Sequence, residues 1–215
     1  MRYKDTMPNA ISIELIEEQV ESWSKKYVRP AFAGDVEAAG RLTISLADHR
    51  RGTMAVAMWR AKVPRAAFRE FFESVWNHDH RHVIAAAGTR RRLQSMFRYA
   101  DFPLPDGLGD EVQIWRGTSA LSIRKASAGF SWTLDRDVAC WFAMRFADLN
   151  GLPLVLSAKV SRSDIVLHTN ERSEHEVVLL VPPLCTVDGN AAEWALVYEQ
   201  KERQIRADKV AGLGQ

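Results

Sequence analysis

Apolar residues recur at helical spacing through the first half of the chain. In residues 11–26 they fall on one stripe with acidic residues between them, which is typical of an amphipathic helix, and Pro30 is expected to end it. A strong helix over residues 65–77 follows Pro64, which suits the first turn of a helix. The same spacing predicts the other helices of this half over residues 35–48, 54–61 and 82–99.

The pattern changes at residues 101–110, where two prolines, two glycines and three aspartates predict a linker or long turn. Beyond it, short β-branched runs alternate with helical spacing. These runs predict strands over residues 112–115, 129–133, 154–160, 164–167 and 176–181. Residues 135–148 predict a helix capped by Asp135, whereas residues 190–210 fit either a closing strand or a helix.

This organisation predicts an α+β protein in two parts. A helical N-terminal region covers residues 1–108, and a mixed region covers residues 109–215. The sequence leaves open whether the first part is a separate domain or an integral layer of the second. With 215 residues, 47% of them hydrophobic and 26% charged, the chain can bury a core without a metal or a disulfide.

The hydropathy of the sequence argues against a membrane or secreted protein, and its charge is unevenly distributed. No run of about 18 apolar residues occurs, and none follows the basic residues near Met1, so we expect no membrane span, no signal peptide and a cytoplasmic location. The net charge is +2, but residues 41–98 hold twelve lysines and arginines against four acidic residues. The arginines at 90–92 fit a solvated helix face, or a patch that meets an acidic protein or nucleic acid.

Three segments of the second half place polar side chains in strand-like surroundings: residues 115–117 (WRG), 130–133 (FSWT) and 173–180 (SEHEVVLL). In an extended strand Glu174 and Glu176 face the same side. Paired carboxylates suit a displacement at a sugar carbon, and an arginine can hold a pyrophosphate by bidentate hydrogen bonds. The segments therefore indicate a phosphorylated glycoside as substrate, with NAD as one candidate.

The order of these segments resembles the Arg-Ser-Glu class of mono-ADP-ribosyltransferases, which includes bacterial binary toxins and bacteriophage enzymes that modify host proteins. The resemblance covers about residues 112–181. It departs from the family pattern at Trp132, in the middle of the Ser-Thr-Ser motif, and at Thr133, in place of the final serine. It implies a fold of two packed small β-sheets with flanking helices, and NAD as the substrate.

The resemblance also implies roles for the residues that would meet NAD. Arg116 would bind the phosphate and ribose region, and the backbone of Gly117 would lie against the nicotinamide amide. Ser131 would brace the catalytic glutamate, and Thr133 would support the nicotinamide side. Glu176 would bond the nicotinamide ribose and stabilise the oxocarbenium ion as nicotinamide leaves.

The same family pattern implies where an acceptor would bind. Glu174 would position or deprotonate it, and in this family a first glutamate in the Glu-x-Glu pair accompanies arginine acceptors. The turn over residues 168–173 (HTNERS), with His168 and Arg172, would recognise the acceptor. This turn lacks the aromatic residue that many relatives carry, so the substrate stays open.

The function expected from this resemblance is transfer of ADP-ribose from NAD to an arginine of a target protein, with release of nicotinamide. The protein would be a phage-encoded modifier of host proteins or a toxin-like bacterial effector. Two alternatives remain: an NAD glycohydrolase or nucleic-acid ADP-ribosyltransferase, and an inactive binding module of the same fold. No metal is expected, because the alternating histidines of residues 77–82 do not share a helix face. The oligomeric state is left open.

Overall fold

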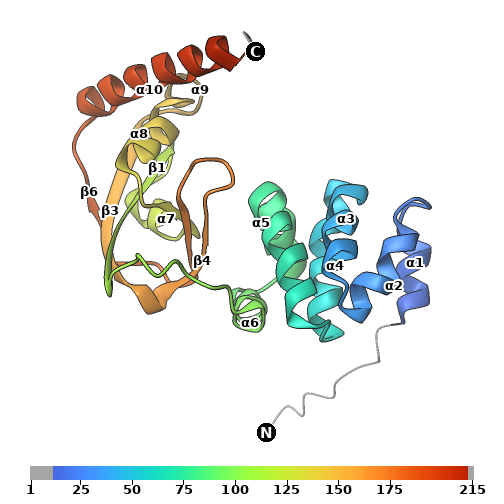
Figure 1. The fold of residues 1–215 in the computed structure, drawn as a ribbon. Coiled ribbons are helices and arrows are strands. Elements are labelled where there is room, and N and C mark those ends of the chain that lie inside the picture. Colours follow the sequence, from blue (N-terminus) through green and yellow to red (C-terminus); the bar gives the residue numbers. More distant parts are fainter. Residues whose placement is uncertain (1–11, 213–215) are drawn as a thin grey trace, which may run out of the picture. The chain divides into compact units, whose positions relative to one another are not determined.

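The computed structural model describes residues 12–212 and divides the chain into two units (Figure 1). Unit 1 spans Met1–Phe102 and unit 2 spans Pro103–Gln215. The described part of unit 1 is helical and unit 2 is mixed, so the protein is of the α+β class. The sequence suggested a division after residue 108. In the structure the division falls earlier, after Phe102, at the start of an irregular segment rich in proline and glycine.

The described part of unit 1 is built of helices that follow one another along the chain. They are α1 (Ile13–Gln19), α2 (Lys25–Ala33), α3 (Val36–Ser45), α4 (Asp48–Arg60), α5 (Arg65–Ala87) and α6 (Arg90–Ala100). The stripe of residues 11–26 was expected to form one helix, but it is interrupted after Gln19, and Ile11 lies outside the described residues. Pro30 does not end a helix: it lies inside α2, which ends at Gly34 with a left-handed φ of 106°.

The core of unit 1 is built on α5. The apolar face that the sequence predicted for residues 65–77 is confirmed: its largest buried side chains are Phe68, Phe71, Phe72, Val75 and Trp76. Each such aromatic contributes about 2 kcal/mol by leaving water. The helix then continues through a kink at Asp79, whose carboxylate pairs with Arg51 at 2.5 Å, and ends at Gly88. The helix expected over residues 82–99 is therefore divided between α5 and α6.

Unit 2 combines a sheet with helices. Its elements are β1 (Glu111–Ser119), α7 (Ile123–Ser127), β2 (Ser131–Thr133), α8 (Arg136–Met144), α9 (Ala147–Asn150), β3 (Pro153–Ser161), η1 (Arg162–Asp164), β4 (Ile165–Thr169), β5 (Glu176–Leu179), β6 (Thr186–Val187) and α10 (Ala191–Gly212). The ambiguous residues 190–210 are helical. The strands expected around residues 112, 131, 154, 165 and 176 are confirmed, whereas α7 and β6 were not foreseen.

The strands of unit 2 form one antiparallel sheet in the order β4-β5-β2-β1-β3-β6. The expectation of two separate packed sheets is therefore not met in the described residues. The sheet nevertheless has two three-stranded halves, which are joined by the single register pair Trp115–Thr133. Beyond that pair β1 and β2 run apart. This fork in the sheet is where the polar segments of the sequence meet.

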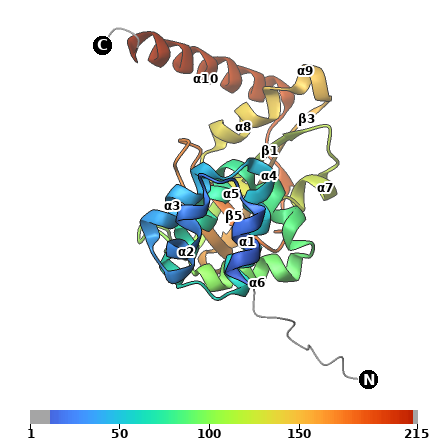
Figure 2. The same cartoon turned by 90° about the vertical axis from the view of Figure 1, so that its right-hand side faces the viewer.

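Both faces of the sheet are covered by apolar side chains. One face carries a core around Ile114, Trp132 and Val177. On the other face α8 packs on the sheet, and α10 packs on α8 (Figures 1 and 2). Asp135 caps α8 as the sequence predicted, by accepting from the backbone N–H of Val138. Within residues 12–212, every helix is too short or too polar to cross a bilayer.

We expect residues 103–215, produced without unit 1, to fold alone, because the sheet, both of its cores and the covering helices all belong to unit 2. Urea unfolding followed by circular dichroism should show one cooperative transition. A chain without a cooperative transition would make unit 1 an integral layer of the fold.

Candidate active site

The fork between β1 and β2 holds Arg116. It follows the last pair between the two strands, and its Nη1 donates to the carbonyl oxygen of Ser131. Gly129 makes room for the guanidinium, since a Cβ there would overlap it. Burial lowers the pKa of Arg116 below its usual value, and the negative charge of Glu176 acts in the opposite direction. Among the described residues, the Arg116 Nε has no hydrogen-bond partner. The charges of this buried cation and of Glu176 therefore interact.

Glu176 is the first residue of β5 and is buried, with 7% of its surface exposed. The antiparallel register places it opposite Thr133 of β2 on one side and Thr169 of β4 on the other. Directly opposite residues of antiparallel strands share a face. The sheet therefore sets this carboxylate in a row with two hydroxyls, one from the neighbouring strand of its own hairpin and one from β2, which is distant in sequence.

The two hydroxyl residues of β2 have different partners. Ser131 lies on the same face of β2 as Thr133, but in the described structure its hydroxyl makes no hydrogen bond to Glu176. The hydroxyl of Thr133 donates to the carbonyl oxygen of Glu174 at 2.6 Å and accepts from the backbone N–H of Asp135 at 3.0 Å. Thr133 therefore joins the segment before β5 to the start of α8.

Glu174 lies in the turn before β5, so strand alternation is not what pairs it with Glu176. His175 between them has a left-handed φ of 46°, which interrupts the extended backbone that the sequence predicted. The carboxylates come together instead through Arg172, whose Nη2 lies 2.8 Å from Glu174 Oε2 and 3.9 Å from Glu176 Oε2. The expected pair of carboxylates is present, but a turn and an arginine produce it.

The charges around Glu174 alter its proton affinity. Burial raises the pKa of its carboxyl group above the usual range; the positive charge of Arg172 opposes this, and Glu176 adds to it. Arg145, at the end of α8, also acts to lower the pKa of Glu174, so its guanidinium is close enough to contribute. A raised pKa suits a carboxylate that accepts a proton near neutral pH.

Arg145 is a residue that the sequence interpretation missed. Its Cζ lies 4.6, 5.1 and 4.4 Å from the ring centroids of Trp141, Phe142 and Phe146. These rings are half-buried or exposed, and they surround the guanidinium. The available signal was the spacing of Trp141 and Phe142, four and three residues before Arg145. The indole N–H of Trp141 donates to Glu202 of α10 at 2.8 Å, which fixes this ring.

The sequence also predicted site roles for Gly117 and His168, and the structure places these two residues in different surroundings. Gly117 lies where β1 touches α8, and a Cβ there would overlap the carbonyl oxygen of Ala139. This glycine therefore allows the close approach of strand and helix. His168 belongs to β4 and pairs with Val177, so the alternation of β5 places it on the face opposite Glu176. Burial lowers the pKa of His168, and His175 adds to this. The structure does not bring His168 to the carboxylates.

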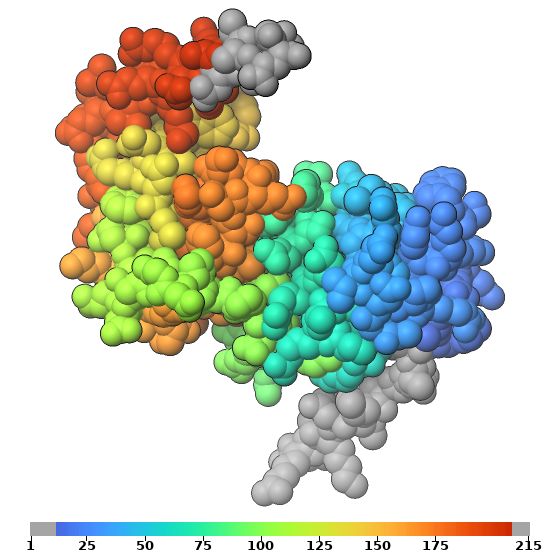
Figure 3. All heavy atoms as spheres, viewed as in Figure 1, coloured from blue at the N-terminus to red at the C-terminus, as the bar shows by residue number. Residues whose placement is uncertain are grey.

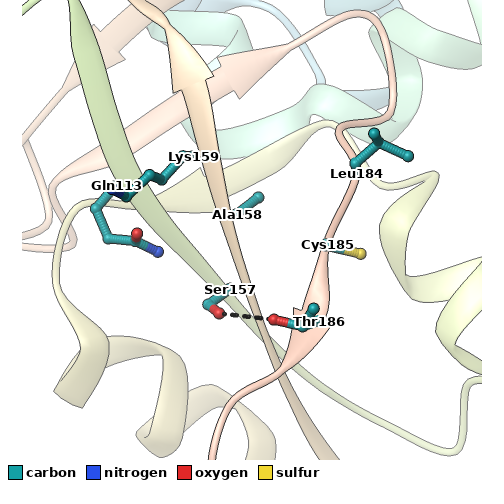
Figure 4. A pocket seen from close by; sticks show the side chains of 7 residues that line it. All are labelled: Gln113, Ser157, Ala158, Lys159, Leu184, Cys185 and Thr186. Atoms are coloured by element: carbon teal, nitrogen blue, oxygen red, sulfur yellow. Dashed lines mark hydrogen bonds between the residues drawn. The ribbon is translucent and has the colours of Figure 1, made fainter.

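The turn between β4 and β5 is exposed on the face of unit 2 shown in Figure 3, where it is coloured orange beside the yellow of α8. A separate pocket of about 290 Å³ lies along β1, β3 and β6 (Figure 4). Gln113, Ser157, Lys159 and Cys185 line it, and none of the predicted site residues does. The charged residues at the turn are therefore distinct from this pocket.

No protein-family model, curated protein or solved structure matches this chain. In the part of the chain that the structure describes, no three histidine, cysteine, aspartate or glutamate side chains come together as metal ligands would. The functional argument therefore rests on the geometry of the site.

Proposed function

We propose that unit 2 is an NAD-dependent mono-ADP-ribosyltransferase of the Arg-Ser-Glu class, which transfers ADP-ribose to an arginine of a target protein and releases nicotinamide. One observation carries the proposal: three segments distant in sequence bring Arg116, Ser131 and Glu176 to one fork in the sheet, with Glu174 beside them. On this proposal, the two three-stranded halves of the sheet correspond to the two packed sheets of the family fold.

In this reaction the bond between the ribose C1″ and nicotinamide breaks, and its electron pair leaves with nicotinamide. Positive charge then develops on the ribose, and Glu176 is the nearby anion that stabilises it. Because Glu176 is buried, water screens this interaction poorly. Glu174, which is more exposed, accepts the proton that the attacking arginine nitrogen releases.

Two cations are suited to the pyrophosphate of NAD. Arg116 is fixed at the fork, and Arg145 is held against the rings of α8. Guanidinium groups bind phosphate oxygens by charge-assisted, bidentate hydrogen bonds. The rings of Trp141 and Phe146 offer flat apolar surface beside Arg145, which suits a nicotinamide or adenine ring.

The proposed context is a bacterial cell, in which the protein acts as a phage-encoded modifier of host proteins or as a toxin-like effector.

Incubation with a bacterial lysate and NAD labelled on the adenylate tests this function. We expect label that protease removes and nuclease does not, with the hydroxylamine sensitivity of an arginine linkage. Nuclease-sensitive label would favour nucleic acid as acceptor, which the basic residues 41–98 would suit. Loss of NAD without label would indicate a glycohydrolase. Absence of nicotinamide release with every acceptor would leave a binding module.

As the pH is lowered, the rate of ADP-ribose transfer to arginine should begin to fall at a higher pH than it would if the proton acceptor were a glutamate of ordinary pKa. Burial raises the pKa of Glu174, so its carboxylate takes up a proton above the usual value of about 4.3 and then cannot accept one. The rate of transfer to a small guanidine such as agmatine, measured from pH 4 to 8, checks this. Glu174→Gln should lack this acidic limb in its residual rate. The same limb in both proteins would assign it to another group.

A further inference from the structure

The guanidinium of Arg172 lies where an acceptor arginine would have to lie. Its Nη2 is 2.8 Å from Glu174, the proposed proton acceptor, and 3.9 Å from Glu176, the proposed anion of the transition state. An arginine of another protein would need the same two carboxylates. The chain therefore presents its own guanidinium to the site that is to modify guanidinium groups.

The turn that carries Arg172 is shaped to return its side chain to these carboxylates. Asn170 closes the turn: its side-chain oxygen accepts from the backbone N–H of His175 at 3.0 Å, and its carbonyl oxygen accepts from Ser173 at 3.0 Å. Ser173 and His175 both have left-handed φ values, 55° and 46°. The closed turn places the backbone of Arg172 close to both carboxylates, and its guanidinium pairs with them.

Arg172 is also accessible. Its side chain is 46% exposed, whereas those of Glu174 and Glu176 are 22% and 10% exposed. An ion pair this exposed is weak and exchanges readily with solvent. The guanidinium can therefore turn toward a bound dinucleotide while its carboxylate neighbours stay in place.

We propose that Arg172 is itself an ADP-ribose acceptor, modified at the Glu174–Glu176 site of its own chain. This proposal rests on the proposed function. A terminal nitrogen of Arg172 forms a bond to C1″ of the nicotinamide ribose as the bond from C1″ to nicotinamide breaks. Nicotinamide leaves with the electron pair, and the proton released by the guanidinium passes to Glu174 and then to water. The reaction needs NAD alone and places one ADP-ribose on each chain at this position.

The test uses the full chain and NAD labelled on the adenylate, without lysate. Label is expected on the wild-type protein, with the peptide that contains Arg172 carrying the mass of one ADP-ribose. Arg172→Lys, which keeps the positive charge, should lose at least about 90% of this label. Arg124→Lys is the matched control, because Arg124 is an exposed arginine of α7 in the same unit. The Arg124→Lys protein should be labelled to the same extent as the wild type.

The failures of the two proposals are distinguishable. If nicotinamide is released and added agmatine is modified while Arg172 stays unlabelled, self-modification is wrong and the transferase activity stands. If no nicotinamide is released with any acceptor, both are overturned.

The route within one chain is tested by mixing. A Glu176→Gln chain with a distinguishable mass is incubated with the wild type and labelled NAD. Label is expected on the wild-type chain alone. Label on Arg172 of the inactive chain at a comparable level would overturn transfer within one chain.

Discussion

Glu176→Gln is expected to lower ADP-ribose transfer by about 100- to 1000-fold, the loss typical when one electrostatic group of a buried site is removed. Glutamine keeps the shape of the side chain but removes the negative charge that opposes the developing cation. The effect is large because Glu176 is buried, so water screens its charge poorly. Release of nicotinamide, followed over time with and without agmatine, measures it.

A matched control separates this loss from a general effect of charge. Glu111 is an exposed carboxylate at the start of β1 in the same sheet, and Glu111→Gln should transfer at the wild-type rate. Circular dichroism should show that both variants keep the fold. Undiminished transfer by Glu176→Gln would show that Glu176 is not catalytic and would contradict the proposed mechanism.

Gly117→Ala is expected to destabilise unit 2 by about 3 kcal/mol or more, since overpacking against backbone is costly. The added methyl group would overlap the carbonyl oxygen of Ala139, and backbone cannot move aside as a flexible side chain can. The strand would have to withdraw from α8, which carries Arg145 and its aromatic neighbours. Activity should therefore fall together with stability.

The midpoint of urea unfolding measures this effect, with Gly107→Ala as the control. Gly107 lies in the irregular segment of the same unit, and a Cβ there would meet no atom within 4 Å. That variant should unfold within about 0.5 kcal/mol of the wild type. An unchanged midpoint in Gly117→Ala would mean that β1 and α8 are not packed as closely as the structure has them.

The local sequence pattern predicted those features that depend on residues within a single helix or strand. The apolar face of α5 could be predicted because its period is that of a helix, and the cap of α8 because Asp135 acts on the residues directly after it. Local rules failed at Pro30, which was expected to end a helix and instead lies within α2. There the packing of Val28, Ala31 and Phe32 into the core offsets the lost hydrogen bond.

The sequence by itself determined the helical first part, the mixed second part and the candidate residues Arg116, Ser131 and Glu176. Only the tertiary structure decided that these residues meet at a fork in one sheet, that Glu174 stands in a turn and that His168 faces away. It also placed Arg172, which the resemblance had assigned to acceptor recognition, between the two carboxylates, and it added Arg145, whose charge acts on Glu174. The physical reason is that strand register and turn geometry depend on contacts between segments distant along the chain, which no local period encodes.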